Sequence, residues 1–511
     1  MKVSATFPPE GTLRSWLDHR AVTDGARISH LFAEGPDLTW AELRAAASEV
    51  AGHLTGMGVA KGESVALMLP NSREGVLCLF GVFYGGFRAA VINLVAGAEA
   101  MGFALAHSDA KVLLLGTAQT ELFEAASALH DISARVVEVS ANEGVIGWPE
   151  GGRCAALWDV APQDHALLMY TSGTTGRPKG VLHSQASLLA GGWTSVLAHA
   201  LTDADRAMCV LPIYHINGLC VTIIAPLISG GSVLVCERFS ASKFWSNCAR
   251  HEVTWFSVVP TIISHLLHGD KDPDAATKRR IRFGRSASSA LAVETQSAFE
   301  NRFEVSIVET MGLTETAAQI LSNPLPPGPR KVGSAGLAYG NEATILSSDL
   351  RPVPSGVEGE IAVRGPNVMQ GYLKNPEATA AGFTPDGWLR TGDLGKMDAD
   401  GYVFVTGRLK ELIIKGGENI APREVDEALY THPDVIEAAA FARICPQYGE
   451  RVEAAVKLRK GACVDQAALI QLCLEKLGKF KCPDVVHLLD DLPKGPSGKI
   501  QRLRLAAMTG E

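Results

Sequence analysis

The chain has 511 residues, of which 47% are hydrophobic and 20% are charged, and its formal net charge at pH 7 is −8. This length predicts two to four folding units rather than a single core, and the composition is that of a globular protein. The mildly acidic balance argues against nucleic-acid binding, because a domain that binds nucleic acid normally presents a basic face.

Signals for secretion, membrane insertion and cross-linking are weak. The segment before Trp16 lacks the apolar core of a secretory signal. The apolar stretches at 76–87 and 221–235 contain Gly or Pro and are too short to span a bilayer. The ten cysteines are scattered without a CxxC pair, which indicates reduced core thiols rather than disulfides or zinc ligands. We therefore expect a cytoplasmic protein with no membrane span.

Strand and helix signals alternate along the first half of the chain. Residues 38–57 read as an amphipathic helix, with Thr39 and Glu42 forming a capping box and Gly58 ending the helix. Alternation of this kind predicts a parallel sheet with helices on its faces. The further predicted helices are 74–87 and 98–107, and the predicted strands are 64–68, 89–93, 111–115, 166–170, 207–211, 232–236 and 255–259.

The pattern changes near Val332, where short strands and turn signals begin to dominate. Residues 398–401, with the sequence Asp-Ala-Asp-Gly, are expected to join two β-rich runs as a hairpin. Helix and strand signals return after Gly416 and Gly417. The expected elements there are helices 422–430 and 464–477 and strands 435–443, 451–458 and 485–489.

Residues 170–180, with the sequence YTSGTTGRPKG, form the most informative stretch. Its glycines permit close backbone approach, so that N–H groups and hydroxyls can surround phosphate oxygens, and Lys179 adds a positive charge. The loop follows an apolar strand, and a helix is expected after it. It is not a Walker A loop, because Pro178 stands where that pattern requires Gly. A flexible polar loop is the alternative that its composition alone would allow.

This stretch resembles the signature loop of the adenylate-forming superfamily, which includes acyl-CoA synthetases, luciferases and the adenylation domains of peptide synthetases. The resemblance implies that the loop binds the phosphates of ATP and that Thr175 takes part in catalysis. The residues that would bind ATP here are Thr171, Ser172, Gly173, Thr174, Gly176 and Lys179.

Two further stretches resemble motifs of the superfamily around the acyl group and the nucleotide. In 212–218 (PIYHING), His215 matches the residue that gates the acyl pocket. In 311–315 (MGLTE), Thr314 would contact the α-phosphate and Glu315 would hold Mg²⁺, a cation that prefers carboxylate and phosphate oxygens. Taken alone, a single His or a Thr-Glu pair is more often structural.

The residues around Thr314 complete the expected nucleotide site. Met311 stands where the superfamily usually has an aromatic residue beside adenine, and its thioether can still pack on a purine ring. Glu309 and Thr310, which precede it, are assigned to the same nucleotide-binding site through the resemblance.

Three later stretches resemble the remaining motifs. In 388–393 (WLRTGD), Asp393 matches the carboxylate that accepts from the ribose hydroxyls. In 407–413 (GRLKELI), Arg408 would reach the nucleotide and Lys410 matches the pivot of the hinge. In 492–500 (LPKGPSGKI), Lys499 matches the lysine that neutralises charge between the carboxylate and the α-phosphate during adenylation. The alternatives are a turn aspartate, a charged surface link and a generic C-terminal lysine.

The resemblance extends over nearly the whole chain and implies an α/β fold of two parts. The large N-terminal domain, residues 1–407, would contain parallel and mixed sheets flanked by helices and a small barrel-like β part. Residues 408–410 would form a hinge, and residues 411–511 a small mobile α+β domain. Gly416 and Gly417 are assigned to the coenzyme A tunnel, because glycines leave room for a narrow thiol arm.

The implied activity is that of an AMP-forming acyl-CoA synthetase. A carboxylic acid and ATP would give an acyl-adenylate and pyrophosphate, and coenzyme A would then give the thioester and AMP, with Mg²⁺ as cofactor. One alternative is an enzyme that loads the thiol of a carrier protein, although this chain lacks a carrier domain. Another is a relative that retains only one half-reaction. The expected partners are small molecules, and a homodimer is compatible with the resemblance.

The downstream region most resembles the oxalyl-CoA synthetase branch, through residues 285–288, 322–331 and 410–422. Enzymes of that branch hold the second carboxylate with a Ser and a His. Ser288 matches the Ser, whereas Ala318 stands where the His would be. We therefore expect oxalate to react poorly, and a small or medium acid with a larger or less charged far end to react faster. The expected pocket lining is His215, Asn217, Ser257, Ser288, Thr310 and Ala318.

Overall fold

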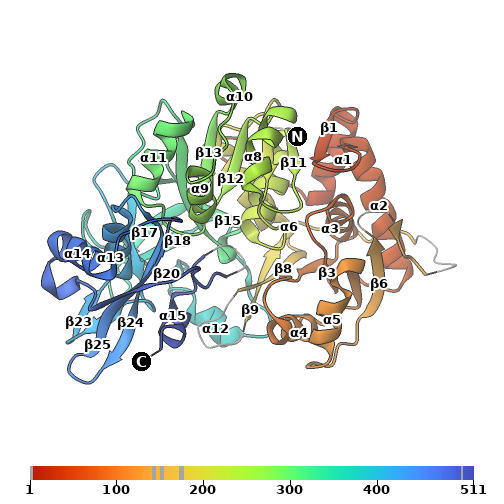
Figure 1. Cartoon of the computed structure of the whole chain (residues 1–511). Coiled ribbons are helices and arrows are strands. Elements are labelled where there is room, and N and C mark those ends of the chain that lie inside the picture. Colours follow the sequence, from red (N-terminus) through yellow and green to blue (C-terminus); the bar gives the residue numbers. More distant parts are fainter. Residues whose placement is uncertain (1–3, 141–144, 150–154, 172–177, 496–498, 511) are drawn as a thin grey trace.

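The computed structural model describes residues 4–140, 145–149, 155–171, 178–495 and 499–510. Two large sheets and the helices between them form most of the molecule, and residues after about 410 form a smaller part at one side (Figure 1). This mixed α/β architecture with a large and a small part agrees with the sequence prediction.

The nine-stranded sheet has a parallel centre and antiparallel edges. Helices α8, α9 and α11 cover one face, where Phe244 and Phe299 pack against Phe256. Its strands, in spatial order, are β16 (Leu337–Ala338), β15 (Ala318–Ser322), β14 (Ile307–Leu313), β13 (Phe283–Ser286), β12 (Trp255–Val258), β10 (Arg206–Cys209), β11 (Ser232–Val235), β1 (Ile28–Phe32) and β2 (Leu38–Thr39). Its outer helices are α8 (Ala241–Arg250), α9 (Pro260–Leu267), α10 (Ala275–Arg280) and α11 (Val293–Phe303).

The eight-stranded sheet is also parallel at its centre. Its strands, in spatial order, are β19 (Gly371–Tyr372), β9 (Lys179–Ser184), β8 (His165–Thr171), β4 (Arg88–Val91), β3 (Ser64–Met68), β5 (Val112–Gly116), β6 (Arg135–Ser140) and β7 (Val145–Ile146). The helices α4 (Ala98–His107) and α5 (Thr120–Ser127), with the short η1 (Thr117–Gln119), cover its outer face.

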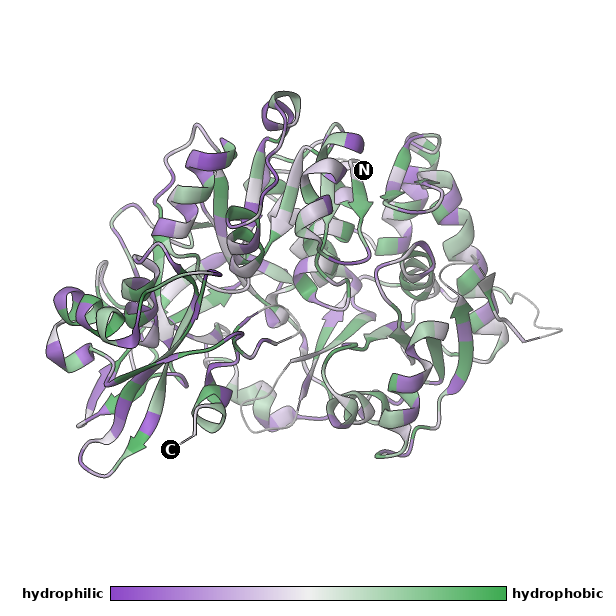
Figure 2. Ribbon diagram, viewed as in Figure 1, coloured by the Kyte–Doolittle hydropathy of each residue, from purple (hydrophilic) through white to green (hydrophobic). Residues whose placement is uncertain are grey.

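A layer of helices lies between the two sheets and forms the main core. Side chains of both inner sheet faces, such as Leu67 and Trp255, belong to one buried cluster with these helices. Figure 2 shows the hydrophobic residues concentrated in the strands and hydrophilic residues on outer helices such as α10 and α14. The inner elements are α1 (Leu13–Thr23), α2 (Trp40–Gly56), α3 (Arg73–Gly85), α6 (Gln185–His199), the π-helix η2 (Asn217–Ile224) and α7 (Ala225–Ser229).

Local signals set several boundaries as predicted. The Thr39 hydroxyl accepts from the backbone N–H of Glu42, and the Glu42 carboxylate accepts from Thr39, so the predicted capping box is confirmed. The predicted helix after the phosphate loop is present, but a strand that the sequence did not predict precedes it. Strand β9 comes first and pairs antiparallel with β8, and α6 begins only at Gln185. Pairing with other strands, rather than local propensity, decides this segment.

Most of the β-rich segment after Val332 forms a four-stranded antiparallel sheet, and α12 (Pro376–Ala381) packs against β19 of the eight-stranded sheet. The predicted hairpin at 398–401 is confirmed, because it joins β20 and β21. The prediction of a barrel-like part needs correction: within the described residues the sheet is open and closes into no barrel. Its strands are β17 (Glu342–Leu346), β18 (Gly359–Arg364), β20 (Leu389–Met397) and β21 (Val403–Arg408).

The C-terminal part has its own sheet and its own core, in which Val425 and Leu429 pack with Val456 and Leu469. The predicted helix 422–430 is confirmed as α13. The elements are β22 (Ile413–Lys415), β23 (Glu418–Ile420), α13 (Pro422–Tyr430), β24 (Val435–Cys445), β25 (Gly449–Leu458), α14 (Gln466–Lys481), β26 (Val485–Leu488) and α15 (Arg502–Met508).

The two parts touch away from the connecting turn. The Ser264 hydroxyl on α9 donates to the carbonyl of Ile436 (3.1 Å), and His265 Nε2 lies 3.8 Å from the buried carboxylate of Glu437 on β24. The segment that connects the two parts is short: β21 ends at Arg408 in one sheet, and β22 begins at Ile413 in another. The C-terminal part is therefore held against the large part by polar contacts as well as by the connecting segment.

Two general predictions can be checked on the described residues. Among them, no helix is both long and apolar enough to cross a membrane. The nine cysteines that the structure describes are free thiols, and Cys154 lies outside the described residues.

Candidate active site

The predicted site residues gather near the carboxyl ends of the central parallel strands. Ser257 lies on β12 and Glu309 on β14, while the motif of Glu315 follows β14 as the short helix η3 (Thr314–Thr316). Loops at the carboxyl ends of parallel strands are where α/β proteins generally bind their ligands. The fold therefore places these motifs at one edge, although they lie far apart in the sequence.

The two ends of the predicted phosphate loop are held by paired strands. Thr171 ends β8 and is the register partner of Lys179, which begins β9. The hairpin thus fixes the points where the loop leaves and re-enters the sheet. The loop residues predicted to bind or act on ATP lie outside the described residues, namely Ser172, Gly173, Thr174, Thr175 and Gly176.

Lys179, Tyr372 and Glu315 form a connected group beside this hairpin. Lys179 Nζ lies 4.9 Å from the centre of the Tyr372 ring, a cation–π distance. The Tyr372 hydroxyl donates to Glu315 Oε1 (2.9 Å). Burial and the neighbouring Glu315 carboxylate raise the pKa of Tyr372, so the phenol stays protonated and keeps donating. Tyr372 therefore orients the carboxylate that the sequence assigns to Mg²⁺.

The backbone of Thr314 is positioned by a buried histidine. His183 Nε2 donates to the carbonyl oxygen of Thr314 (2.7 Å), and His183 Nδ1 lies 3.1 Å from the Ser187 hydroxyl. Burial lowers the pKa of His183 to about 4, so the ring is neutral at pH 7. A neutral ring can donate from Nε2 and accept at Nδ1, which fits both contacts.

The other predicted nucleotide residues lie along β14. Met311 is half-buried and packs against the apolar cluster that contains Ile320 and Val363. The Thr310 hydroxyl donates to the carbonyl of Ser286 (3.2 Å). Glu309 is buried on the face of β14 opposite to Thr310, where Oε1 accepts from the backbone N–H of Leu291 (3.1 Å), and burial raises its pKa to about 7.

Asp393, Arg408 and Lys499 come together where the two parts of the chain meet. Asp393 on β20 is the register partner of Arg408 on β21, and Arg408 Nε lies 2.9 Å from Asp393 Oδ1. Burial raises the pKa of Asp393, and the positive charges of Arg408 and Lys499 oppose this shift. The structure thus brings the predicted ribose carboxylate close to the predicted catalytic lysine.

Lys499 is half-buried and lies 4.0 Å from Glu411 Oε1. Burial and the neighbouring Arg408 lower the pKa of the Lys499 ammonium group, while Glu411 and Asp393 raise it. The backbone carbonyl of Lys499 accepts from the N–H of Gly495 (2.7 Å). Its ammonium group is therefore held among charges from both parts of the chain.

The predicted pivot, Lys410, lies in an exposed turn between β21 and β22. The N–H of Leu409 donates to the carbonyl of Gly392 (3.0 Å), and the N–H of Glu411 donates to the carbonyl of Arg408 (2.9 Å). The turn is thus anchored on its N-terminal side to the strand that carries Asp393.

Gly416 and Gly417, the predicted tunnel residues, form the turn between β22 and β23. Both have positive φ, +60° and +87°, and Lys415 pairs with Glu418 across them. A two-residue hairpin turn with two positive φ values strongly favours glycine. The turn geometry explains both glycines without reference to a ligand.

The predicted acyl-pocket residues form a polar network on the inner face of the nine-stranded sheet. Asn217 Oδ1 accepts from the Ser257 hydroxyl (3.0 Å), and Asn217 Nδ2 donates to the Ser288 hydroxyl (3.4 Å). His215 precedes the π-helix η2 and lies 5.2 Å, centroid to centroid, from Tyr214. Asn217, Ser257 and Ser288 are thus brought together.

Two residues near this network have an unusual backbone. Ser288 has φ +73°, and Ala318, which is buried at the start of β15, has φ +82°. Residues other than glycine rarely adopt such values, and they concentrate at functional sites, where the surrounding structure enforces them. β15 packs against η2, which places Ala318 on the same side of the sheet as Asn217.

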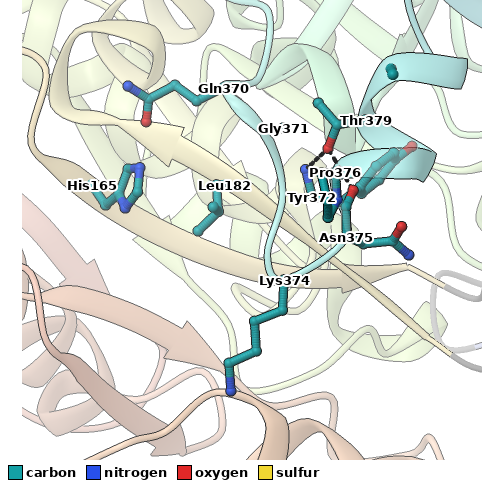
Figure 3. Close-up of a pocket in the computed structure, with 10 residues that line it drawn as sticks. His165, Leu182, Gln370, Gly371, Tyr372, Lys374, Asn375, Pro376 and Thr379 are labelled. Carbon is teal, nitrogen blue, oxygen red and sulfur yellow. Dashed lines mark hydrogen bonds between the residues drawn. The ribbon is translucent and has the colours of Figure 1, made fainter.

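A surface pocket of about 500 Å³ lies beside the group of Lys179 and Tyr372 (Figure 3). Gln370, Tyr372 and Lys374 line it, and the Thr379 hydroxyl bridges its wall by accepting from the N–H of Tyr372 (2.9 Å) and donating to the carbonyl of Asn375 (2.8 Å). It shares Tyr372 with the candidate site, and the predicted acyl-pocket residues do not line it.

Three residues of this region were not assigned a role from the sequence. His183 and Tyr372 hold Thr314 and Glu315, and the buried Arg285 donates to Asn217 and Ser257. Their roles depend on contacts between distant segments, so no local signal could have identified them.

Comparison with known families agrees with the arrangement of these motifs. The profile described as AMP-binding enzyme matches residues 12–373, which is more than half of the chain. The profile described as AMP-binding enzyme C-terminal domain matches residues 424–499.

Two relatives of known name match over nearly their whole length. The sulfoacetate–CoA ligase of Cupriavidus necator is 46% identical over 473 residues, which is 92% of each chain. The oxalate–CoA ligase of Arabidopsis thaliana is 36% identical over 503 residues, which is 96% of each chain.

Among solved structures, the ATP-bound form of MatB from Rhodopseudomonas palustris superposes with a TM-score of 0.88 at 30% identity, covering 98% of this chain and 99% of that one. The apo form of the same protein gives a TM-score of 0.79. The chain belongs to the AMP-binding enzyme family.

Proposed function

We propose that this protein is an AMP-forming acyl-CoA synthetase, which converts a carboxylic acid to an acyl-adenylate and then to a coenzyme A thioester. One observation carries the proposal: Lys499, from the C-terminal part, lies beside Asp393 and Arg408 of the ribose and hinge motifs. A cation delivered by a separate part of the chain to the nucleotide site suits a reaction in which two anions must meet.

In the first half-reaction the carboxylate attacks the α-phosphate of ATP, and pyrophosphate leaves. Lys499 and Lys179 would neutralise the developing charge, and Asp393 would accept from the ribose hydroxyls. Glu315, oriented by Tyr372, fits a Mg²⁺ ion, which is commonly bound by one or two carboxylates together with phosphate oxygens. When bound, this ion would neutralise phosphate charge.

In the second half-reaction the thiol of coenzyme A attacks the acyl carbon, and AMP leaves. Lys499 has no role in this step, so its removal from the site would free space for the thiol. We propose domains at residues 1–407 and 411–511 with a hinge at 408–410. Rotation about this hinge would break the contacts of Ser264 and His265 with β24 and present the turn of Gly416 and Gly417 to the thiol arm.

The substrate is proposed to be a short carboxylic acid. The relatives named above act on sulfoacetate and oxalate, as their names state. Ala318 stands where the oxalate branch has a histidine, which disfavours oxalate. We further propose a cytoplasmic location and a homodimer. Light scattering on purified protein would test the homodimer.

Acid-dependent exchange of labelled pyrophosphate into ATP tests the proposed activity. Sulfoacetate, oxalate, malonate, acetate and 2-succinylbenzoate form a suitable panel, each measured with and without coenzyme A. We expect exchange without coenzyme A and thioester formation with it. Exchange without any thioester would favour a carrier-protein thiol as acceptor or a relative with one half-reaction. Absence of exchange with every acid would contradict the proposal.

A further inference from the structure

Arg285 is a buried cation with only neutral partners. Its side chain belongs to β13, faces the inner helices and is 1% exposed. Nη1 donates to Asn217 Oδ1 (2.8 Å) and Ser257 Oγ (3.0 Å), and Nε donates to Gln319 Oε1 (3.4 Å). No Asp or Glu in the described part of the chain lies within 4.0 Å of its nitrogens, since none of the ion pairs there includes Arg285.

The neighbouring titratable groups do not supply a negative charge. Burial lowers the pKa of His199 on α6 well below its ordinary value, so this ring is neutral. Burial raises the pKa of Cys220 on η2, so this thiol is protonated. Burial lowers the pKa of Arg285 itself to about 9, so its guanidinium is charged at pH 7. The positive charge therefore has no counter-ion among these neighbours.

A buried charge at this position makes the free energy of folding less favourable. Moving an ion from water into the protein interior has a penalty that neutral hydrogen bonds offset only in part, and buried charges are normally paired. An apolar side chain of similar volume would fill the same space at lower cost. The position of Arg285 is therefore better explained by a ligand than by stability.

The guanidinium of Arg285 contacts residues of the predicted acyl pocket. Nη2 makes no hydrogen bond within the described residues, which leaves two N–H donors available. The partners of Nη1, Asn217 and Ser257, are predicted pocket residues, and Asn217 reaches a third, Ser288. Gln319 adjoins Ala318, the fourth. The cation thus contacts two of the six predicted pocket residues directly and is linked to Ser288 and Ala318 through Asn217 and Gln319.

We propose that Arg285 is a specificity-determining residue that binds a second, anionic group at the far end of the acid. The substrate class is then a short carboxylic acid with a sulfonate or a second carboxylate. The inference rests on the proposed function, because it assigns the far end of the acid in the same reaction. Asn217 and Ser257 would orient the guanidinium, and Ser288 would add a neutral hydrogen bond.

Matched pairs of acids test this proposal on the unmodified enzyme. Sulfoacetate is compared with methylsulfonylacetate, and malonate with malonamate, because each pair differs mainly in the far-end charge. Pyrophosphate exchange should proceed with kcat/KM about 10- to 100-fold higher for the charged member, the range of a charge-assisted hydrogen bond. The sulfonate and carboxylate pairs show which anion fits better.

Substitutions test whether Arg285 causes the preference for the charged acid of each pair. Arg285→Gln should lower kcat/KM about 10- to 100-fold for the charged acids and less than about threefold for the neutral ones. Arg282→Gln is the matched control, because Arg282 is a nearby arginine already paired with Asp205 (2.6 Å) and should leave the ratio unchanged. Retained exchange with the neutral acids shows that the variant is folded.

The outcomes separate this inference from the proposed function. Equal or better exchange with the neutral acids by the unmodified enzyme would overturn the role of Arg285 while leaving the proposed function intact. A parallel loss for charged and neutral acids in Arg285→Gln would overturn it as well. Absence of exchange with every acid would contradict the proposed function and this inference together.

Discussion

Arg408 and Asp393 face each other across β21 and β20, with 2.9 Å between Arg408 Nε and Asp393 Oδ1. Arg408 is the last residue of its strand before the turn that leads to the C-terminal part, and Asp393 lies in the ribose motif. The ion pair therefore connects the proposed hinge to the proposed nucleotide site, and Lys499 lies within electrostatic reach of both.

Lys499→Ala should separate the two half-reactions. We expect pyrophosphate exchange to fall by at least about 100-fold, the loss typical for a group that stabilises transition-state charge. Thioester formation from supplied acyl-adenylate should remain largely intact. Lys457→Ala, which removes an ion pair with Asp491 in the same part of the chain, should leave both rates unchanged. Equal loss of both half-reactions in Lys499→Ala would count against domain alternation.

Lys410→Pro should have the opposite effect. Proline fixes φ near about −65° and restricts the preceding residue, so the turn loses the freedom that rotation requires. Pyrophosphate exchange should survive, whereas thioester formation should fall by roughly tenfold or more. Lys410→Ala serves as the control and should reduce thioester formation much less. An unchanged overall rate in Lys410→Pro would show that Lys410 is not the pivot.

Tyr372→Phe should weaken the use of Mg²⁺. The substitution removes the hydroxyl that donates to Glu315, and a hydrogen bond to a charged group is worth about 1.5–3 kcal/mol. The Mg²⁺ concentration for half-maximal exchange should rise about 10- to 100-fold. Tyr402→Phe is the control, because the Tyr402 hydroxyl donates to the carbonyl of Pro329 instead. The same Mg²⁺ dependence in both variants would remove Tyr372 from the site.

Ala318→His tests the expectation about oxalate. The added imidazole supplies the donor that Ala318 lacks, and His is enriched at the positive φ of this position. We expect kcat/KM for oxalate to rise about three- to tenfold relative to a monocarboxylic acid of similar size, the range of one hydrogen bond. An unmodified enzyme that prefers oxalate over every other acid would refute this expectation.

The pH dependence of substrate choice should follow Arg285. Burial lowers its pKa to about 9, so the guanidinium is protonated below that pH and loses its proton as the pH rises through it. The ratio of kcat/KM for sulfoacetate to that for methylsulfonylacetate should therefore be constant below about pH 8 and fall above about pH 9. His199 and Cys220 stay neutral in this range. A ratio that already falls between about pH 7 and pH 8, where the guanidinium is fully charged, would argue against the role of Arg285.

The sequence predicted the elements whose signals are local. Thr39 and Glu42 marked the start of α2, and Asp398 to Gly401 marked the hairpin between β20 and β21, because capping and turn residues act within a few positions. The segment directly after the phosphate loop was not predicted to form a strand before the next helix. Its strand, β9, is formed by pairing with β8 and β19, which the local sequence does not encode.

In the candidate site, too, some residues could be predicted from the sequence and others depend on contacts between distant segments. Motifs with a distinctive order, such as those of Lys499 and Asp393, could be assigned through the resemblance, and the structure places them near each other. Residues that hold the site, such as His183 and Tyr372, could not, because each acts on a partner far away in the sequence. Arg285 was seen only as part of a motif, since its lack of an acidic partner is a property of the folded chain.

The central claim is that the acid is activated as an acyl-adenylate, and an isotope label tests it most directly. A carboxylic acid labelled with ¹⁸O in both carboxyl oxygens is incubated with the enzyme, ATP, Mg²⁺ and coenzyme A, and the products are examined by mass spectrometry. Attack of the carboxylate on the α-phosphate predicts AMP that carries one ¹⁸O atom, with unlabelled pyrophosphate. Formation of ADP with labelled phosphate, or of AMP without label, would contradict the account.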